Sequence, residues 1–392
     1  MSSGPDPTAP RAAGTARVLH VMHTWGVLSH TFLHSTVRHT PVRSATVLCR
    51  QRTGPPPASG DPRLVAIGGL TGRLPGPVQG KAGVAVGAAV AAATRADVVH
   101  AHFAHELPLA RRLARRRPLV VSLYGRDLLV EVADDAGLRA DLLAADAVVV
   151  LSRFLAQAAE RAGVTPARIA IVPAGVELDE VGPVEPRPPA PPGTARVLFV
   201  GRLVEKKGPV DAVRAVAGAR ARGVDASLHL VGSGPLRPVV EDAARDLGGH
   251  VTFDDGTERA TVLAALRTAD VVLTPSRTAP DGDAETLLMV NVEAQACGVP
   301  VVTTRHGGIP DGLGPGAGVL VAEGDVEAMA DALAELAGHP EHRARMGAAG
   351  RRWVEAELTA TRAGVRTAAV YQAVQDGTAL PGPTGQGDAS AS

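Results

Sequence analysis

One loop of this chain combines glycines with cations. It reads GRLVEKKG, from Gly201 to Gly208, and joins a predicted strand to a predicted helix. Such a loop presents free backbone N–H groups and the positive end of a helix at the carboxyl edge of a parallel sheet. Arg202 offers a planar fork for a phosphate, and Lys207 offers a compact charge. The loop is therefore either a site for an anionic group or an ordinary solvated connection.

The scarcity of lysine makes this loop stand out. The chain has forty basic residues, but only Lys81, Lys206 and Lys207 are lysines. Two of the three therefore lie in a single loop of a chain that otherwise uses arginine.

A second glycine turn, Gly232-Ser233-Gly234-Pro235, also follows a predicted strand. It suits a close approach of two backbones. It does not complete the GxGxxG pattern of dinucleotide sites, because Arg237 stands where the third glycine is required, and an NAD site is disfavoured.

Two glutamates lie eight positions apart, beyond Thr274-Pro275-Ser276. Glu285 falls in a predicted loop, and Glu293 falls in a helix that Gly298 is expected to end. A carboxylate at the strand ends can accept hydrogen bonds from sugar hydroxyls, and one on the next helix can bind a ribose diol.

Short apolar runs alternate with longer helical patterns along the whole chain, which predicts βαβ units around parallel sheets. A Pro-rich segment, 181–194, interrupts the pattern as a linker would. We expect a disordered leader (1–16), one Rossmann-like domain (17–180), a second (195–376) and a disordered tail (377–392), with the last helix able to pack back on the first domain. The predicted strands are 18–22, 45–48, 64–67, 97–101, 119–123, 147–151, 169–172, 196–200, 227–231, 251–253, 271–273, 299–303 and 318–321.

Residues 195–375 resemble the nucleotide-sugar domain of retaining glycosyltransferases of the GT-B fold, family 4. The motifs that carry the resemblance are GRLVEKKG, LVGSGP, the TPS before Glu285, VEAQACGVPVV and RHGGIPD. The fold that this implies is α/β, with two Rossmann-like doubly wound domains facing across a cleft. In that family the loop cations hold the donor diphosphate, here Arg202 and Lys207. The resemblance places Glu285 beside the donor sugar and Glu293 on the ribose, and Gly232, Ser276 and Gly26 complete the expected donor-binding set.

The first half resembles the family more weakly, and most resembles members that build exopolysaccharides. The matching segments are SHTF at 29–32, HAHFA at 100–104 and SLYGRD at 122–127. Family members often have His-Gly-x-Asp in the last segment, so Tyr124 replaces a histidine. They commonly have Gly-Phe-Gly after the first glutamate, where this chain has Thr286-Leu287-Leu288. Both departures bear on donor choice and on activity.

The resemblance implies transfer of a hexose-type sugar from a nucleoside diphosphate sugar to an acceptor hydroxyl with retention. The acceptor could be a glycan, a lipid-linked molecule or a natural product. We expect front-face attack assisted by the leaving phosphate, with Glu285, His102, Asp127 and Tyr124 as catalytic candidates. His102 and Asp127 would orient or deprotonate the acceptor, or else serve the structure. The alternatives are a sugar-nucleotide epimerase of the same fold and a binding protein that has lost catalysis.

Two metal sites compete with this interpretation. Asp281-Gly282-Asp283 reads as a DxD signature, and His100, His102 and His105 could ligate a transition metal. Because Arg202, Lys207 and a helix N-terminus can supply the positive field, we expect neither a metal nor any other cofactor.

Composition bounds the partners and the compartment. Forty acidic residues balance the forty basic ones, so no global field would attract nucleic acid. Two isolated cysteines and the lack of a signal-peptide pattern indicate a cytoplasmic protein. One basic run is either a solvated helix end or a loose contact with anionic lipid at the inner face of the membrane. It consists of Arg111, Arg112, Arg115, Arg116 and Arg117.

Addition of EDTA to an active preparation decides the metal question. We expect turnover to be unchanged, because protein cations neutralise the leaving group. Loss of turnover that a divalent ion restores would overturn the metal-free interpretation.

Overall fold

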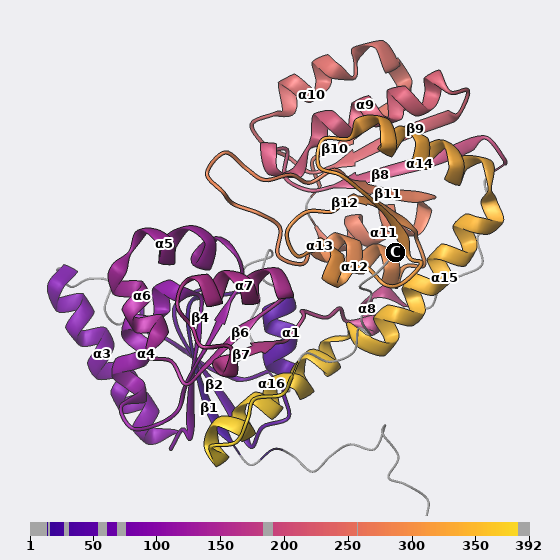
Figure 1. Ribbon diagram of the computed structural model, residues 1–392. Coiled ribbons are helices and arrows are strands. Elements are labelled where there is room, and N and C mark those ends of the chain that lie inside the picture. The colour runs from indigo at the N-terminus through magenta and orange to yellow at the C-terminus, as the bar shows by residue number, and fades with distance from the viewer. Residues whose placement is uncertain are drawn as a thin grey trace, which may run out of the picture.

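The computed structural model describes residues 14, 16–26, 31–53, 61–68, 76–182, 191–256 and 258–382, with only the backbone for 76–81. Two α/β units lie next to each other, the first coloured indigo to magenta and the second pink to orange (Figure 1). Each contains one wholly parallel sheet with helices packed around it. The predicted fold class is confirmed.

The first sheet has seven strands in the order β3-β2-β1-β4-β5-β6-β7. Strands β4 and β5 are buried throughout, as expected for parallel strands covered on both faces. The strands are β1 (Arg17–Trp25), β2 (Ser44–Arg52), β3 (Arg63–Ala66), β4 (Val98–His102), β5 (Leu119–Leu123), β6 (Ala147–Val150) and β7 (Ile169–Ile171). The helices are α1 (Thr31–His39), α3 (Gly76–Ala93), η2 (Ala104–Glu106), α4 (Leu107–Ala114), η3 (Asp127–Glu131), α5 (Val132–Asp134), α6 (Ala136–Leu143), α7 (Arg153–Arg161) and η4 (Pro166–Arg168).

The second sheet has six strands in the order β10-β9-β8-β11-β12-β13. The strands are β8 (Thr194–Val200), β9 (Asp225–Val231), β10 (Val251–Asp254), β11 (Val271–Thr274), β12 (Val301–Thr304) and β13 (Gly318–Val321). The helices from the crossing onward are α8 (Leu178–Val181), η5 (Glu205–Lys207), α9 (Pro209–Ala221), α10 (Arg237–Ala243), η6 (Arg245–His250), α11 (Arg259–Thr268), α12 (Met289–Ala296), α13 (Ile309–Gly312), α14 (Val326–Gly338), α15 (Pro340–Glu357) and α16 (Ala360–Asp376).

The chain crosses between the two units twice, and the two crossings pair with each other through a bridge between Val176 and Thr359. After the second crossing, α16 packs against α1 of the first unit, where the yellow helix lies in Figure 1. Gly364 permits this contact, because a Cβ there would lie 2.4 Å from the backbone oxygen of His39.

Several sequence predictions fall on residues outside those described. They are residues 1–13 and 15 of the leader, residues 29 and 30 of the SHTF segment, the linker segment 183–190 and the tail from 383. The helical segment 127–134 after β5 was not predicted, because its acidic and apolar residues form no clear amphipathic pattern. In the described part of the chain, no helix is long and apolar enough to cross a bilayer.

Substitution of Gly364 by alanine tests the docking of α16. We expect the free energy of unfolding to fall by about 1–3 kcal/mol, although alanine is the better helix former, because the added methyl group meets backbone atoms that cannot yield. Urea denaturation measures the change. Val365→Ala on the exposed side of the same helix is the control, and an equally stable Gly364→Ala protein would contradict the close packing.

Candidate active site

Three loops meet at the carboxyl edge of the second sheet, after β8, β9 and β11. Glycines allow this approach, because added Cβ atoms would collide with backbone oxygens. A Cβ on Gly232 would lie 2.1 Å from the backbone oxygen of Gly201, and a Cβ on Gly208 would lie 2.0 Å from that of Pro275. The predicted donor-binding positions Arg202, Lys207, Gly232 and Ser276 therefore lie on adjoining loops.

The two loop lysines both face the acidic loop after β11. Lys207 Nζ lies 2.8 Å from Glu285 Oε1, and Lys206 Nζ lies 2.8 Å from Asp283 Oδ2 and 4.0 Å from Glu285 Oε1. Arg202 is exposed at the end of β8. The structure thus brings the predicted phosphate cation and the predicted sugar carboxylate into direct contact.

Glu285 is buried, and burial alone would raise its pKa. The charges of Lys207 and Lys206 outweigh that effect, so the pKa of Glu285 lies below its ordinary value. The backbone N–H of Glu285 donates to His306 Nε2 at 3.0 Å. His306 Nδ1 therefore carries the ring proton and donates it to Glu323 at 2.8 Å. His306 belongs to the RHGGIPD motif, but its type and position did not single it out as a site residue.

Ser276 is buried directly after this sheet edge. Its hydroxyl oxygen has no hydrogen-bond partner among the described groups, while its backbone oxygen accepts from Thr304 Oγ1 at 2.5 Å. A buried hydroxyl without a partner suits a position that a ligand completes.

Glu293 lies in α12, which follows the loop of Glu285, and pairs with Arg259 of α11 at 2.5 Å. Burial raises the pKa of Glu293, and Arg259 offsets only part of that effect. Arg259 was not identified from the sequence, because a lone arginine at a helix start has no distinctive spacing.

The DxD carboxylates are both engaged by cations of the protein. Asp281 pairs with Arg126 of the first unit at 2.6 Å, and Asp283 pairs with Lys206. The two aspartates thus contact different cations.

The loop after β5 in the first unit touches the loop after Glu285. Thr286 Oγ1 donates to the backbone oxygen of Tyr124 at 3.0 Å, and Arg153 pairs with Asp311 at 2.7 Å. Tyr124 and Thr286 are the two positions that depart from the family pattern. The two positions that differ from the family pattern are therefore in direct contact.

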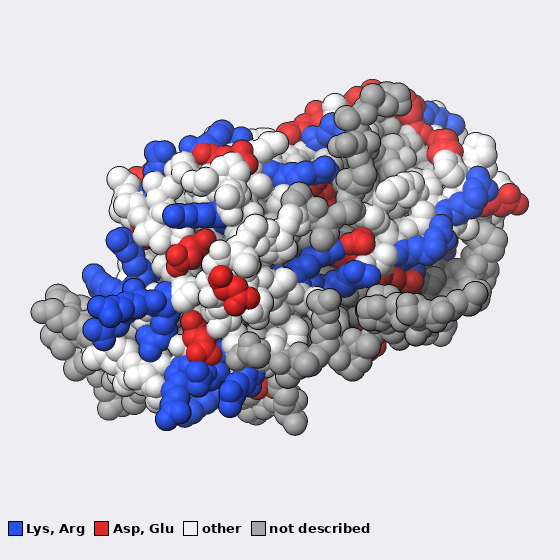
Figure 2. Space-filling view, turned by 60° about the horizontal axis from the view of Figure 1, so that its bottom comes forward, with Lys and Arg blue, Asp and Glu red and all other residues white. Residues whose placement is uncertain are grey.

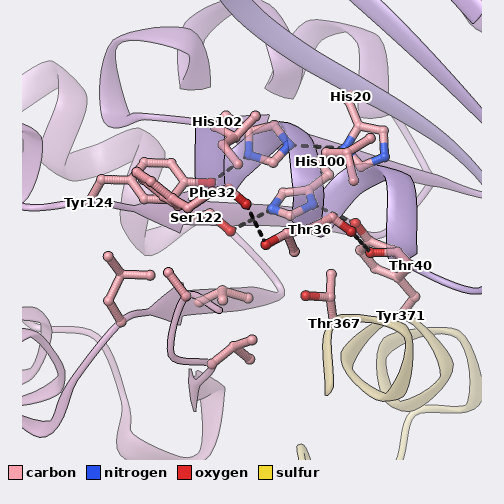
Figure 3. A pocket seen from close by; sticks show the side chains of 16 residues that line it. His20, Phe32, Thr36, Thr40, His100, His102, Ser122, Tyr124, Thr367 and Tyr371 are labelled. Carbon is pink, nitrogen blue, oxygen red and sulfur yellow. Dashed lines mark hydrogen bonds between the residues drawn. The ribbon is translucent and has the colours of Figure 1, made fainter. Parts of the chain in front are cut away.

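The side chains of His102 and Tyr124 are engaged within the first unit, as Figure 3 shows. His102 Nδ1 lies 2.7 Å from the Tyr124 hydroxyl, and His102 Nε2 lies 2.9 Å from His20 Nδ1. Burial raises the pKa of Tyr124. These contacts suit an orienting role for His102.

The predicted trio of His100, His102 and His105 is not assembled, which corrects that alternative. His105 lies apart, exposed beside Glu131, because the chain turns at Phe103, which has a φ of 76°. His20 of β1 takes its place, since it lies opposite His100 in the parallel register.

The buried cluster of His20, His100 and His102 lines a small cavity of about 20 Å³, and its possible ligand nitrogens lie within 4.8 Å of one another. His100 also contacts Ser122 at 2.8 Å and Tyr371 of α16 at 2.6 Å (Figure 3). Burial lowers the pKa of His20 to about 3. The cluster is thus a buried polar network between β1, β4, β5 and α16.

Asp127 accepts hydrogen bonds from the backbone N–H groups of Ala104, Tyr124 and Gly125, at 3.3, 3.0 and 2.8 Å. Burial raises the pKa of Asp127 to about 6, although these hydrogen bonds lower it. The carboxylate therefore fixes the loops after β4 and β5 relative to each other.

Gly26 follows β1 and has a φ of 96°, and its N–H donates to His34 Nε2 at 3.2 Å.

The predicted basic run lies at the end of α4. Arg111 pairs with Asp141 at 2.6 Å and Arg117 Nε donates to the Ala96 oxygen, whereas Arg112, Arg115 and Arg116 are exposed. Basic side chains gather on the first unit at the left of Figure 2.

Known proteins share both halves of this architecture. A model described as "Glycosyltransferase Family 4" matches residues 29–180, and one described as "Glycosyl transferases group 1" matches residues 185–353. A GDP-mannose-dependent alpha-(1-6)-phosphatidylinositol monomannoside mannosyltransferase of Mycolicibacterium smegmatis is 36% identical over 265 residues, which are 63% of this chain and 67% of that protein. A protein named for colanic acid biosynthesis, WcaL of Salmonella typhimurium, is 35% identical over 197 residues, or 49% of this chain and 47% of its own.

A solved structure extends the likeness to the whole fold. The Anabaena protein HepE in complex with UDP has a TM-score of 0.68 at 17% identity, covering 89% of this chain and 97% of its own. Two Rossmann-like units, together with both family models, place the chain among glycosyltransferases of the GT-B type. The chain belongs to glycosyltransferase family 4, as its sequence motifs predicted.

Removal of the Tyr124 hydroxyl tests whether this group serves the structure. We expect Tyr124→Phe to lower the free energy of unfolding by about 1–3 kcal/mol, because His102 Nδ1 loses its buried partner, while nucleotide affinity stays unchanged. Chemical denaturation and calorimetry measure the two quantities. His105→Gln, at an exposed histidine nearby, is the control. Unchanged stability together with reduced transfer would instead mean that the hydroxyl acts on substrate.

Proposed function

We propose that the protein is a retaining glycosyltransferase that moves a hexose from a nucleoside diphosphate sugar to an acceptor hydroxyl. The observation that carries this proposal is the contact of Lys207 with Glu285 at the edge where the three loops meet. A cation for phosphate and an ionised carboxylate for sugar hydroxyls stand together there, as a donor that joins a diphosphate to a sugar requires.

Donor binding rearranges this ion pair. The diphosphate takes the charge of Lys207, with Arg202 contributing from the end of β8. Glu285 is then free to accept hydrogen bonds from the sugar hydroxyls, while Glu293 accepts from the ribose. Gly232, Ser276 and Gly26 line the approach to the donor.

Transfer then proceeds on one face of the sugar. The bond between the anomeric carbon and the phosphate oxygen breaks, and the bond to the acceptor oxygen forms on the same face. The acceptor proton passes to the departing phosphate oxygen. Arg202 and Lys207 stabilise the charge that develops on the diphosphate, so the step requires no metal. Asp127 and His102 hold the loop of the first unit that faces the acceptor.

The relatives favour a nucleoside diphosphate hexose as donor. One is named for GDP-mannose and one solved neighbour holds UDP. We also propose that the basic run at the end of α4 holds the protein loosely on anionic lipid at the inner face of the membrane, because four of its five arginines are exposed. The run consists of Arg111, Arg112, Arg115, Arg116 and Arg117.

A panel of nucleotide sugars that includes GDP-mannose and UDP-glucose tests the donor assignment by thermal shift. We expect at least one donor to stabilise the wild type, and Lys207→Ala to bind it about tenfold to a hundredfold more weakly, because a charge-assisted contact is lost. Arg214→Ala removes an exposed cation from α9 and is the matched control.

If no donor stabilises the wild type more than Lys207→Ala, the diphosphate assignment is wrong. Release of nucleoside diphosphate only when an acceptor is present distinguishes transfer from epimerisation. Donor binding without turnover on any acceptor would instead indicate a binding protein.

A further inference from the structure

Arg259 connects the carboxylate of Glu293 to the segment that joins the two units. Its Nη1 lies 2.5 Å from Glu293 Oε1, and its Nε pairs with Glu180 Oε2. One guanidinium, at the start of α11, therefore bridges carboxylates from α12 and α8. The Glu293 side chain is 13% exposed and that of Glu180 is 49% exposed, so Arg259 spans from an interior position to the surface.

Glu293 depends on this cation. Burial favours the neutral carboxyl group, as the raised pKa indicates, and Arg259 opposes that effect. A ribose diol presents two O–H donors, and an ionised carboxylate can accept a hydrogen bond from each. A protonated carboxyl group has one O–H donor of its own and therefore accepts fewer hydrogen bonds. The ion pair on Oε1 also restrains the position of the Glu293 side chain.

Other charged groups around α12 contact partners other than Glu293. Arg351 of α15 donates to the backbone oxygen of Ala296 at the end of α12, and Asp311 of α13 pairs with Arg153. The strands β11 and β12 carry no charged residues. Arg259 and Glu180 are thus the described groups that set the charge state of Glu293.

The second anchor of Arg259 is itself held. Arg267 Nη2 donates to the backbone oxygens of Glu180 and Val181 at 3.2 and 2.9 Å, and Arg351 Nη1 donates to that of Gly182 at 3.1 Å. The segment that carries Glu180 is therefore fixed against the second unit, and it gives Arg259 a rigid second contact.

We propose that Arg259 is a positioning residue that keeps Glu293 ionised and oriented for the ribose diol of the donor, with Glu180 as its anchor. The inference rests on the donor-site role of Glu293 in the proposed function. Arg259 does not touch the reacting atoms. Through its contact with Glu180, it connects the carboxylate proposed to bind the ribose to the segment between the two units.

Calorimetric titration with ribonucleoside diphosphates and their 2′,3′-dideoxy counterparts tests the proposal without a need for turnover. The probes are GDP and UDP, and the affinity ratio of the ribo to the dideoxy form measures diol recognition. We expect the wild type to prefer the ribo form by about tenfold or more.

The pH dependence of that ratio separates positioning from a merely structural effect. In Arg259→Leu no cation opposes burial, so the pKa of Glu293 rises further. Its carboxyl group is then protonated at low pH and ionised only at higher pH. The preference should be lost at lower pH and return at higher pH, with a midpoint shifted upward from that of the wild type.

Matched variants complete the design. Arg245→Leu removes an exposed arginine of the second unit that contacts neither Glu293 nor the Glu180 segment, and it should keep the wild-type profile. Glu293→Gln should show no preference at any pH, and Arg259→Lys should recover part of it. If Arg259→Leu does not fold, as judged by circular dichroism, Arg259→Gln is used with the same expectation.

Two outcomes overturn the inference in different ways. A wild-type preference that persists unchanged in the Arg259 variant at every pH means that Arg259 does not position Glu293, while the donor assignment stands. Failure of the wild type to bind GDP or UDP removes the donor assignment, and the role of Arg259 with it.

Discussion

The ion pair between Lys207 and Glu285 is the interaction on which the architecture depends. A buried carboxylate is costly without a cation, and these two side chains come from loops 78 positions apart in the chain. They meet because parallel strands deliver their carboxyl ends to one edge, and because Gly208 lets its loop approach Pro275. The same edge thus holds a positive and a negative group in direct contact.

The first unit supports this edge from the other side. Asp127 gathers three backbone N–H groups and so shapes the loop that presents the Tyr124 oxygen to Thr286. Beneath that loop, His20, His100 and His102 form a buried polar network that reaches Tyr371 of α16. The last helix is therefore connected, through buried polar groups, to the surface that faces the second unit.

The sequence predicted what local patterns encode. Apolar runs gave the strands, and their order along the chain placed Arg202, Lys207 and Glu285 at one edge. The sequence did not predict that Lys207 would pair with Glu285, since the spacing of residues carries no information on such contacts. His20 and Arg259 were missed for a related reason. Their roles depend on sheet register and on helix packing across 80 and 34 residues of chain.

Affinity for free nucleoside diphosphate in the Glu285→Gln protein tests the central claim most directly. If Glu285 holds Lys207 until the donor arrives, neutralising it should tighten GDP or UDP binding by about tenfold, while transfer falls, because free diphosphate carries no sugar for Glu285 to bind. Glu205→Gln, in the same lysine loop and exposed, is the control. Weaker binding of both nucleotides by Glu285→Gln would contradict the account.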